Sequence, residues 1–199
     1  MRDEARAERQ AEIEEAAYRV VRARGYRGAS MLAVAREAKA SNETLYRWYG
    51  DKRGLFRAMV ESNAEATRTE LKRALDRGAD PLESLETIAP ILLSMLLGER
   101  AISLNRAAAA DESGELGAAL AAGGRDSVLP LIEELMRRGL TNRSIVAPSA
   151  RTAAEWFISL LIGDQQIRRV IHAVPAPSKA VVSARSEEAL QAFRKLCSG

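Results

Sequence analysis

The sequence predicts an all-α protein, and three observations support that fold class. Alanine, leucine, arginine and glutamate dominate the chain of 199 residues, whereas β-branched residues are sparse and scattered. The dominant residues lose little rotamer freedom in a helix, so their abundance favours helix over strand. Apolar residues recur three and four positions apart in several segments, which is the spacing of one helix face. No alternation of apolar and polar residues persists long enough to predict a sheet.

Capping residues place three short helices and one long helix in the first part of the chain. Gly25 stands where the C-terminal cap of a helix is favoured, and Ser30 and Ser41 are favourable N-caps for the next two helices. Gly50 then ends the third helix, and Asp51 caps the fourth. The expected helices cover residues 4–24, 31–38, 42–49 and 52–75.

The rest of the chain also has helical periodicity, which resumes after a break at the sequence GADP (78–81). Pro90 lies inside the first of these later segments and predicts a kink or a split there. Residues 174–184 have the composition of a loop. The expected helices cover residues 82–97, 101–110, 115–122, 127–139, 148–172 and 186–197.

The net charge of +3 is distributed unevenly along the chain. Residues 1–18 carry three basic and six acidic side chains, net −3, and residues 19–57 carry ten basic and three acidic side chains, net +7. The remaining residues, 58–199, have 17 basic and 18 acidic side chains, net −1. A localised basic block indicates a polyanionic partner. The alternative is a solvated, arginine-rich face, because arginine outnumbers lysine throughout this chain.

Simple counts exclude several classes of protein. No stretch approaches 18 consecutive apolar residues, so no membrane partner is expected, and the charged N-terminus is unlike an export signal. The chain has one cysteine, Cys197, and one histidine, His172. A zinc site or a catalytic pair with histidine is therefore poorly supported, and we expect no enzyme, metal or cofactor. A single thiol fits a reducing compartment, so the expected location is cytoplasmic.

Residues 41–52, SNETLYRWYGDK, hold a dense cluster of aromatic side chains at Tyr46, Trp48 and Tyr49. They lie in the second of two short helices that are joined by a short turn, which is typical of a helix-turn-helix motif. In that motif the second helix enters the major groove of DNA, and its N-terminal residues meet base edges. The basic block surrounds this segment.

Residues 30–56 resemble the N-terminal domain of the TetR family of transcriptional regulators. Their sequence is SMLAVAREAKASNETLYRWYGDKRGLF. Ser30 begins the pattern, Ser41 opens the recognition helix, and a TLY triplet follows at residues 44–46. Tyr49 takes the aromatic position, and a KxxLF element beginning at Lys52 completes the match. The resemblance covers roughly residues 10–60, while residues 80–199 are similar only in their helical style.

The resemblance implies a domain organisation and a function. It implies a DNA-binding domain over residues 1–60, with the helix-turn-helix at about 30–49, and a helical ligand-binding and dimerisation domain over 61–199. Members of the family bind near-palindromic double-stranded DNA as homodimers, and most of them repress transcription. The expected protein is a homodimeric repressor that a small, largely apolar ligand releases from its operator.

The resemblance also assigns candidate DNA-binding residues. Arg47 can contact a phosphate or a guanine, and Glu43 suits a cytosine N4 contact, an internal ion pair, or simply the positive end of a helix. For Tyr46 and Trp48 the alternative to DNA contact is packing in the core, whereas Leu45 and Tyr49 are expected to face inward. The complete candidate set is Ser30, Ser41, Asn42, Glu43, Thr44, Tyr46, Arg47, Trp48 and Lys52.

A ligand cavity and a dimer interface are expected in the C-terminal part. The candidate ligand-binding residues are Leu92, Met95, Leu96, Asn105, Arg106, Trp156 and Phe157, for which core packing is the alternative. The segment 148–172 is apolar on opposite faces, so it needs cover on both sides. Either it is central in its own domain, or a second copy of the chain covers it. The candidate interface residues are Leu131, Leu135, Ile158 and Ile162.

The sequence departs from the family pattern in the turn of the motif. Lys39 stands where the family usually has glycine, and Ala40 replaces a valine. If Lys39 adopts a positive φ, the lysine costs about 1 kcal/mol relative to glycine. These departures concern the shape of the turn and delete no expected DNA contact. The alternative function is a helical protein–protein adaptor whose basic patch meets an acidic partner without reading DNA sequence.

Overall fold

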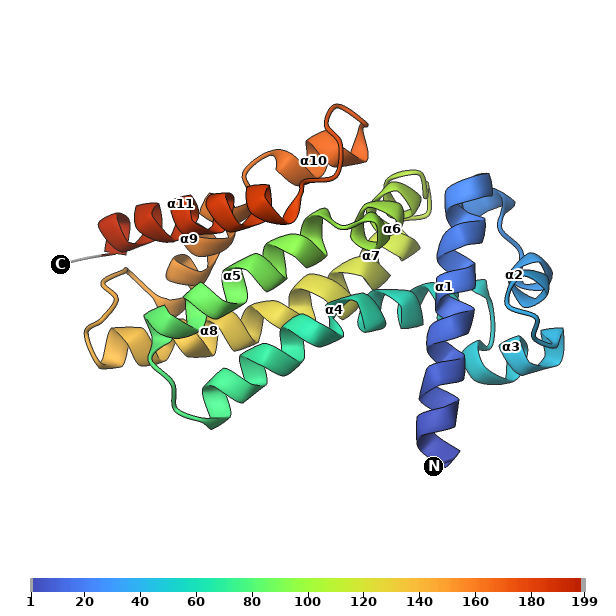
Figure 1. Cartoon of the computed structure of the whole chain (residues 1–199), viewed down its shortest axis with the longest axis horizontal. Helices are drawn as coiled ribbons and strands as arrows, with labels where there is room; N and C mark the ends of the chain where they lie inside the picture. The colour runs from blue at the N-terminus through green and yellow to red at the C-terminus, as the bar shows by residue number, and fades with distance from the viewer. Residues whose placement is uncertain (1, 198–199) are drawn as a thin grey trace. The chain divides into compact units, whose positions relative to one another are not determined.

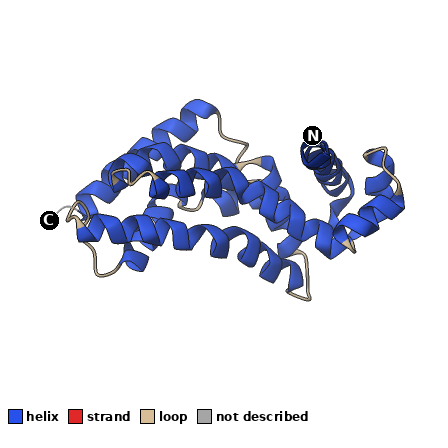
Figure 2. Ribbon diagram, turned by 90° about the horizontal axis from the view of Figure 1, so that it is seen from below, coloured by secondary structure: helices blue, strands red, loops and turns tan. Residues whose placement is uncertain are grey.

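The structure is a computed structural model that describes residues 2–197 (Figure 1). In this part of the chain every regular element is a helix and no strand occurs (Figure 2), which confirms the expected fold class. The chain divides into two compact units. Unit 1 comprises the residues up to Ser62 together with Ser103–Ala121, and unit 2 comprises Asn63–Ile102 together with the residues from Ala122 onward.

Unit 1 is built around three N-terminal helices. These are α1 (Arg2–Gly28), α2 (Met31–Glu37) and α3 (Asn42–Tyr49), with α2 packed against both of the others (Figure 1). The first part of α4 (Lys52–Asp76), the end of α6 (Glu99–Ala109) and α7 (Glu115–Leu120) complete the unit. Its core includes the buried side chains of Ile13, Val34, Leu45, Phe56, Met59, Leu104 and Leu116.

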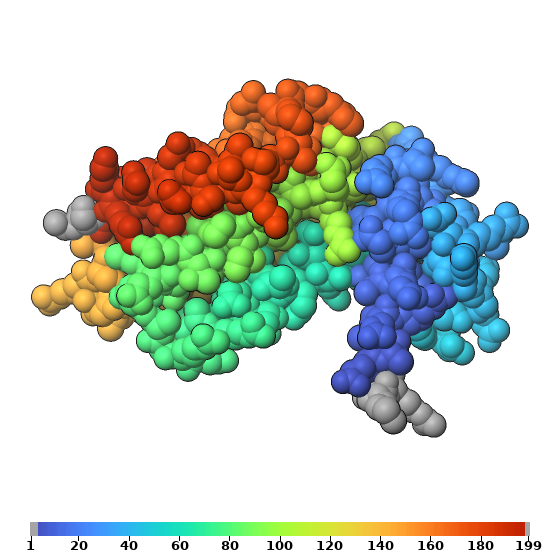
Figure 3. Space-filling model, in the orientation of Figure 1, coloured from blue at the N-terminus to red at the C-terminus, as the bar shows by residue number. Residues whose placement is uncertain are grey.

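Unit 2 is a bundle of longer helices. It contains the end of α4, then α5 (Pro81–Leu97), the start of α6, α8 (Asp126–Thr141), α9 (Ala150–Ile162), α10 (Gln165–Val170) and α11 (Lys179–Cys197). A π-helical turn, Ala121–Arg125, precedes α8. Helix α11 packs on α5 and α9, and its red surface lies along the green surface of α5 in Figure 3. The core of the unit includes Leu71, Leu85, Ile88, Leu93, Ile132, Leu135, Phe157 and Phe193.

No single helix among residues 2–197 is both long and apolar enough to cross a membrane. Helices α5 and α6 meet the criteria of length and composition only when they are taken together, across a bend of 50°.

The expected capping residues are confirmed at the starts of α2 and α3. The Ser30 hydroxyl accepts a hydrogen bond from the amide of Ala33, and the Ser41 hydroxyl accepts one from the amide of Thr44. Gly25 has φ 68° and ψ 165° and interrupts the helical backbone as expected, but a further turn continues to Gly28. Pro90 lies inside one continuous helix, α5, so the chain is not split there.

The single helix expected over residues 148–172 is wrong. The chain leaves the helical conformation at Gly163, which has φ 51° and ψ −133°, and α9 and α10 are separate helices. The apolar pattern continues through this break, but Ile167, in α10, and Ile171, directly after it, are 57% and 62% exposed. The apolar periodicity therefore did not indicate the turn, which the conformational freedom of Gly163 permits.

The loop expected over residues 174–184 is too long, and the last helix expected over 186–197 is too short. Helix α11 already begins at Lys179 and continues for 19 residues. Ser178 stands before its first turn and accepts a hydrogen bond from the amide of Val181. A serine that caps a helix explains the earlier start, because it satisfies an amide that has no partner within the helix.

Lys39 forms the turn between α2 and α3 with a left-handed backbone. Its φ is 51°, the conformation in which the family resemblance would place a glycine. The amide of Lys39 donates to the carbonyl of Arg36, and the amide of Ala40 donates to the carbonyl of Ala35. This pair of bonds is the Schellman motif, which glycine normally closes because it has no Cβ. The turn therefore keeps its expected geometry at the expense of local strain.

Replacing Lys39 with glycine is expected to stabilise the protein. Relief of the left-handed strain should raise the free energy of unfolding by about 1 kcal/mol, measured by urea denaturation followed by circular dichroism. Lys39→Ala is the matched control, because it removes the same charge but keeps the Cβ. Equal stability of the two variants would show that charge rather than backbone strain sets the effect.

Candidate nucleic-acid interface

The first turn of α3 is fixed by its own side chains. In addition to the cap from Ser41, the hydroxyls of Ser41 and Thr44 share a hydrogen bond of 2.8 Å. Thr44 is half-buried, while Asn42 and Glu43 are exposed. The Thr44 amide is thus satisfied by the cap, and the exposed side chains of Asn42 and Glu43 remain available for a partner.

The inward face of α3 holds the helix in the core of unit 1. Leu45 is 0% exposed and Tyr49 is 9% exposed, which confirms the expected direction of both side chains. The Tyr49 hydroxyl is buried without a hydrogen-bond partner. Burial, together with the nearby Glu14 carboxylate, raises the pKa of Tyr49 well above its usual value, so this phenol stays neutral.

The outward face of α3 carries polar and aromatic side chains. Tyr46 is 49% exposed, and Arg47, one residue later, is also exposed. Within the described residues the Glu43 carboxylate has no ion pair, so the internal pair considered as one role for Glu43 is absent there. Two explanations for a carboxylate at position 43 remain: a contact with a cytosine base, and a favourable charge at the helix N-terminus.

Trp48 lies at the edge between the core and the surface. Its indole packs against the core of unit 1 and is half-buried. The guanidinium carbon of Arg6, on α1, lies 5.7 Å from the centroid of the Trp48 ring, a cation–π distance. Trp48 therefore packs against the core with part of its ring and leaves the rest near the surface.

Two further candidates lie at the starts of the helices that flank α3. Ser30 is exposed at the start of α2, and Lys52 is half-buried at the start of α4. The Lys52 ammonium lies 4.1 Å from the centroid of the Tyr26 ring and donates to the carbonyl of Arg27 at 3.4 Å. Burial lowers the pKa of Lys52 and raises that of Tyr26 to about 12. We call Ser30 and Lys52 the helix-start pair.

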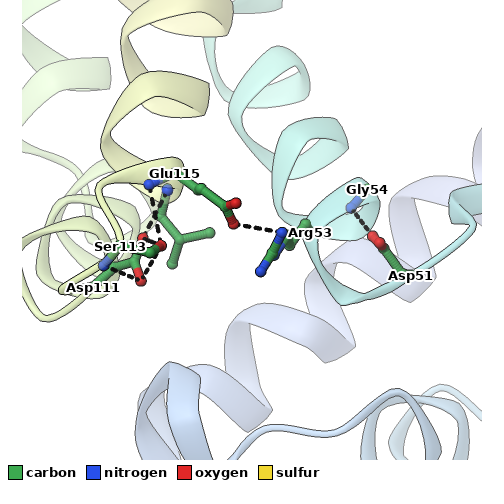
Figure 4. A network of polar contacts seen from close by, with 7 residues as sticks. Asp51, Arg53, Gly54, Asp111, Ser113 and Glu115 are labelled. Atoms are coloured by element: carbon green, nitrogen blue, oxygen red, sulfur yellow. Dashed lines mark hydrogen bonds and ion pairs between the residues drawn. The ribbon is translucent and has the colours of Figure 1, made fainter.

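The junction between α3 and α4 depends on a glycine that sequence reasoning did not select. A Cβ built on Gly54 would lie 1.8 Å from the carbonyl oxygen of Tyr49, so no other residue fits without a backbone shift. The Asp51 carboxylate accepts a 2.7 Å hydrogen bond from the Gly54 amide (Figure 4). The sequence contained only the cap at Asp51 as a signal, because close approach of the Tyr49 carbonyl is a property of the folded chain.

The predicted ligand-binding residues lie in both units. Leu92, Met95, Leu96, Trp156 and Phe157 belong to the core of unit 2 or pack against it, and Phe157 is fully buried in an edge-to-face contact with Phe193. Asn105 and Arg106 are half-buried and belong to unit 1. Binding of a ligand by this set stays a prediction.

The predicted interface residues differ in exposure. Leu131, on α8, and Ile158 and Ile162, on α9, are half-buried at the edge of the unit 2 core. Leu135 is 0% exposed and belongs to that core. Its side chain is therefore not available to a second copy in this conformation. The sequence could not show this, because an apolar stripe on a helix looks the same whether its own core or a partner covers it.

A groove of about 490 Å³ in unit 2 is lined by none of the predicted ligand-binding residues. Its lining includes Arg169 and Arg185, whose guanidiniums bind the ends of neighbouring helices. Arg169 Nε donates to the carbonyl of Leu97 at 3.1 Å, and Arg185 Nε donates to that of Leu161 at 3.2 Å. These arginines satisfy the last carbonyls of α5 and α9, which is a structural role.

Family comparisons match both parts of the chain. Residues 13–59 match the family "Bacterial regulatory proteins, tetR family", and residues 83–196 match "AefR-like transcriptional repressor, C-terminal domain". The second match alone covers more than half of the chain. The chain belongs to the TetR family. It is therefore a TetR-family transcriptional regulator with a helix-turn-helix, and this family is not one of enzymes.

Solved structures agree with this membership of the TetR family. A TetR-family transcriptional regulator from Mesorhizobium loti is 25% identical, with a TM-score of 0.77, covering 97% of this chain and 98% of that chain. One from Agrobacterium tumefaciens is 27% identical, with a TM-score of 0.73, covering 95% and 94%. The transcriptional regulator FadR from Bacillus subtilis, in complex with stearoyl-CoA, shares the fold at 14% identity, with a TM-score of 0.74 and coverage of 92% and 96%. No curated protein matches the sequence.

Substitution of Gly54 with alanine is expected to destabilise the protein. The overlap with the Tyr49 carbonyl forces the junction apart, and overpacking of this kind costs about 1–3 kcal/mol. The free energy of unfolding in urea measures the loss. Gly117→Ala is the matched control: its Cβ meets nothing within 4 Å, and alanine in a helix should stabilise by about 0.5–1 kcal/mol. Wild-type stability of Gly54→Ala would refute the close approach.

Proposed function

We propose that this TetR-family protein is a homodimeric repressor that binds a near-palindromic operator and is released by a small, largely apolar ligand. The observation that carries the DNA-binding part is the division of α3 into two faces. Leu45 and Tyr49 anchor one face, and Asn42, Glu43 and Arg47 are exposed on the rest of the helix. The helix lies within the basic block of residues 19–57.

The exposed side chains of α3 have the chemistry needed to read a base sequence. Arg47 can bind guanine or a phosphate, and Asn42 can bind adenine through its amide. Ser41, Thr44, Tyr46 and Trp48 border this surface, and their hydroxyl and indole groups suit phosphate contacts. The helix-start pair suits phosphates as well, because helix N-termini attract anions. In a dimer, two such helices would read half-sites about 34–36 Å apart or a multiple of that distance.

Dimerisation is supported by the apolar rim of unit 2. Trp156, Ile158 and Ile162 on α9, with Leu131 on α8, are half-buried around the core. Half-buried apolar side chains on two adjacent helices suit an intermolecular four-helix bundle. The fully buried Leu135 is left out of the proposed interface.

Release by a ligand is supported by the apolar composition of unit 2 and by relatives. One structural neighbour is described as a flavonoid-responsive regulator, and another was solved with stearoyl-CoA. Helices α4 and α6 each contribute residues to both units, so they are the covalent routes by which a ligand could act on α3. Such a ligand must prefer the geometry that does not bind DNA, and the coupling between the two sites is reciprocal. A regulator of chromosomal DNA in a bacterium would act in the cytoplasm.

Selection from random duplex DNA should enrich a near-palindromic operator. Arg47→Ala is expected to weaken binding to it by about 1–3 kcal/mol, the value of one good base contact, measured by fluorescence anisotropy. Glu43→Ala should instead relax the preference at one base position, if the carboxylate accepts from cytosine. Arg151→Ala, a substitution of an exposed arginine in α9, is the control and should leave the affinity unchanged.

One outcome would overturn the DNA-reading role. If no sequence is enriched and affinity for every duplex simply falls with salt, the basic block is only an electrostatic patch. The protein–protein adaptor would then be the better function.

Substitution of Ile158 with aspartate is expected to convert a dimer into a monomer. A charge placed in a buried apolar interface has no partner and is costly to desolvate. Sedimentation velocity measures the change, and circular dichroism checks that the helices persist. Ile167→Asp is the control, because that side chain is 57% exposed and lies outside the proposed interface. Dimers of unchanged stability in both Ile158→Asp and Ile162→Asp would contradict the proposed interface.

A further inference from the structure

A short acidic segment of unit 1 lies against the basic part of the same unit. This acidic turn, Asp111–Glu115, has the sequence DESGE and connects α6 to α7 (Figure 4). It follows the helix-turn-helix by some sixty residues in sequence, yet it packs within the same compact unit.

Local hydrogen bonds fix the shape of the acidic turn. The Asp111 carboxylate accepts from the Leu116 amide at 2.9 Å and from the Ser113 hydroxyl at 2.8 and 2.9 Å. These bonds hold the pKa of Asp111 below its usual value. Gly114 takes a left-handed φ of 74°, and Leu116 is only 3% exposed in the core of unit 1. The turn is therefore anchored at its end and presents the other two carboxylates in defined positions.

The two remaining carboxylates pair with arginines of the basic block. Glu112 Oε1 lies 2.7 Å from a guanidinium nitrogen of Arg27, and Glu115 Oε2 lies 2.5 Å from one of Arg53 (Figure 4 shows the second pair). All four side chains are at least half exposed. Pairs with this exposure contribute little to stability, so an external anion can displace the carboxylates.

The paired arginines border the helix-start pair. The carbonyl of Arg27 accepts the hydrogen bond from the Lys52 ammonium, and Arg53 directly follows Lys52 in the chain. Ser30 lies only three residues after Arg27. The acidic turn thus neutralises two cations beside the residues proposed to hold DNA phosphates.

We infer that the acidic turn is an intramolecular competitor of DNA: Glu112 and Glu115 occupy Arg27 and Arg53 in the free protein and are displaced by backbone phosphates in the complex. The inference rests on the proposed function. Breaking these ion pairs lowers the affinity for the operator, because each arginine must lose a glutamate carboxylate before it gains a DNA phosphate. The turn follows the end of α6, which contributes residues to both units, so the competition lies on a route open to the proposed ligand.

The test measures the salt dependence of DNA binding for Glu112→Gln and Glu115→Gln. Affinities for the selected operator and for a duplex of unrelated sequence are determined by anisotropy over a range of salt concentrations. The slope of log K against log salt should stay close to the wild-type slope, because the same arginines meet the same phosphates in both complexes. Affinity at a fixed salt concentration should rise about two- to fivefold per pair broken, in keeping with exposed ion pairs. Melting temperatures should change little.

Two controls separate local competition from a general change of charge. Glu83→Gln removes the same charge from an exposed position in unit 2 and should leave the DNA affinity unchanged. In an Arg53→Gln background, Glu115→Gln should bring no gain, because no arginine is left to release.

The outcomes distinguish this inference from the proposed function. Equal gains in Glu83→Gln, or a gain that persists without Arg53, would replace competition by a general field effect and overturn the inference. Unchanged or weakened binding in both glutamate variants would also overturn it, and would give the ion pairs a structural role. If the wild-type protein shows no preference for any operator, the proposed function itself fails.

Discussion

Burial of one face of α3 is the constraint on which the rest of the candidate interface depends. A helix of eight residues is too short to be stable alone in water, so its structure must come from tertiary packing. Leu45 supplies that packing at the centre of the unit 1 core, and Tyr49 adds to it one turn later. Because these two side chains share a face, Arg47 is directed to solvent without further cost. The exposure of the candidate DNA-reading residues is therefore a consequence of the anchor and not a separate feature.

The turns on either side of α3 set its angle, and both use unusual backbone geometry. Before α3, a lysine closes a Schellman motif that would be relaxed with glycine, so this turn holds strain. After α3, the first turn of α4 approaches the carbonyl of Tyr49, the last residue of α3, so closely that only glycine fits at position 54. A helix fixed at both ends by backbone contacts cannot rotate to relieve a poor contact on its surface. The backbone that carries the exposed side chains is accordingly held by contacts within unit 1, which would lower the entropy lost on binding DNA.

The sequence predicted those features whose causes are local. Ser30 and Ser41 were recognisable as caps because a cap needs only the next three residues. The helix type and the helix-turn-helix followed from local pattern and family resemblance, whereas the positive φ at Lys39 was raised only as a condition that the structure then met. Features with distant causes were missed. The break at Gly163 was missed because the apolar pattern continues past it into exposed positions. The helical spacing of Leu135 did not indicate whether its own core or a partner covers it. The pairing of Arg27 with Glu112 joins residues 85 apart, which no local pattern contains.

The contribution of residues 103–121 to unit 1 changes how signals can reach the DNA-binding residues. Leu104 and Leu116 are buried in the same core that holds Leu45, so the core around α3 is incomplete without a segment that follows α5 in the chain. Leu104 lies on α6, and the first residues of that helix belong to unit 2. A helix transmits displacement along its axis because its backbone hydrogen bonds keep it stiff. Under the proposed function, a ligand that shifts the start of α6 would act through this one helix on the packing that anchors α3.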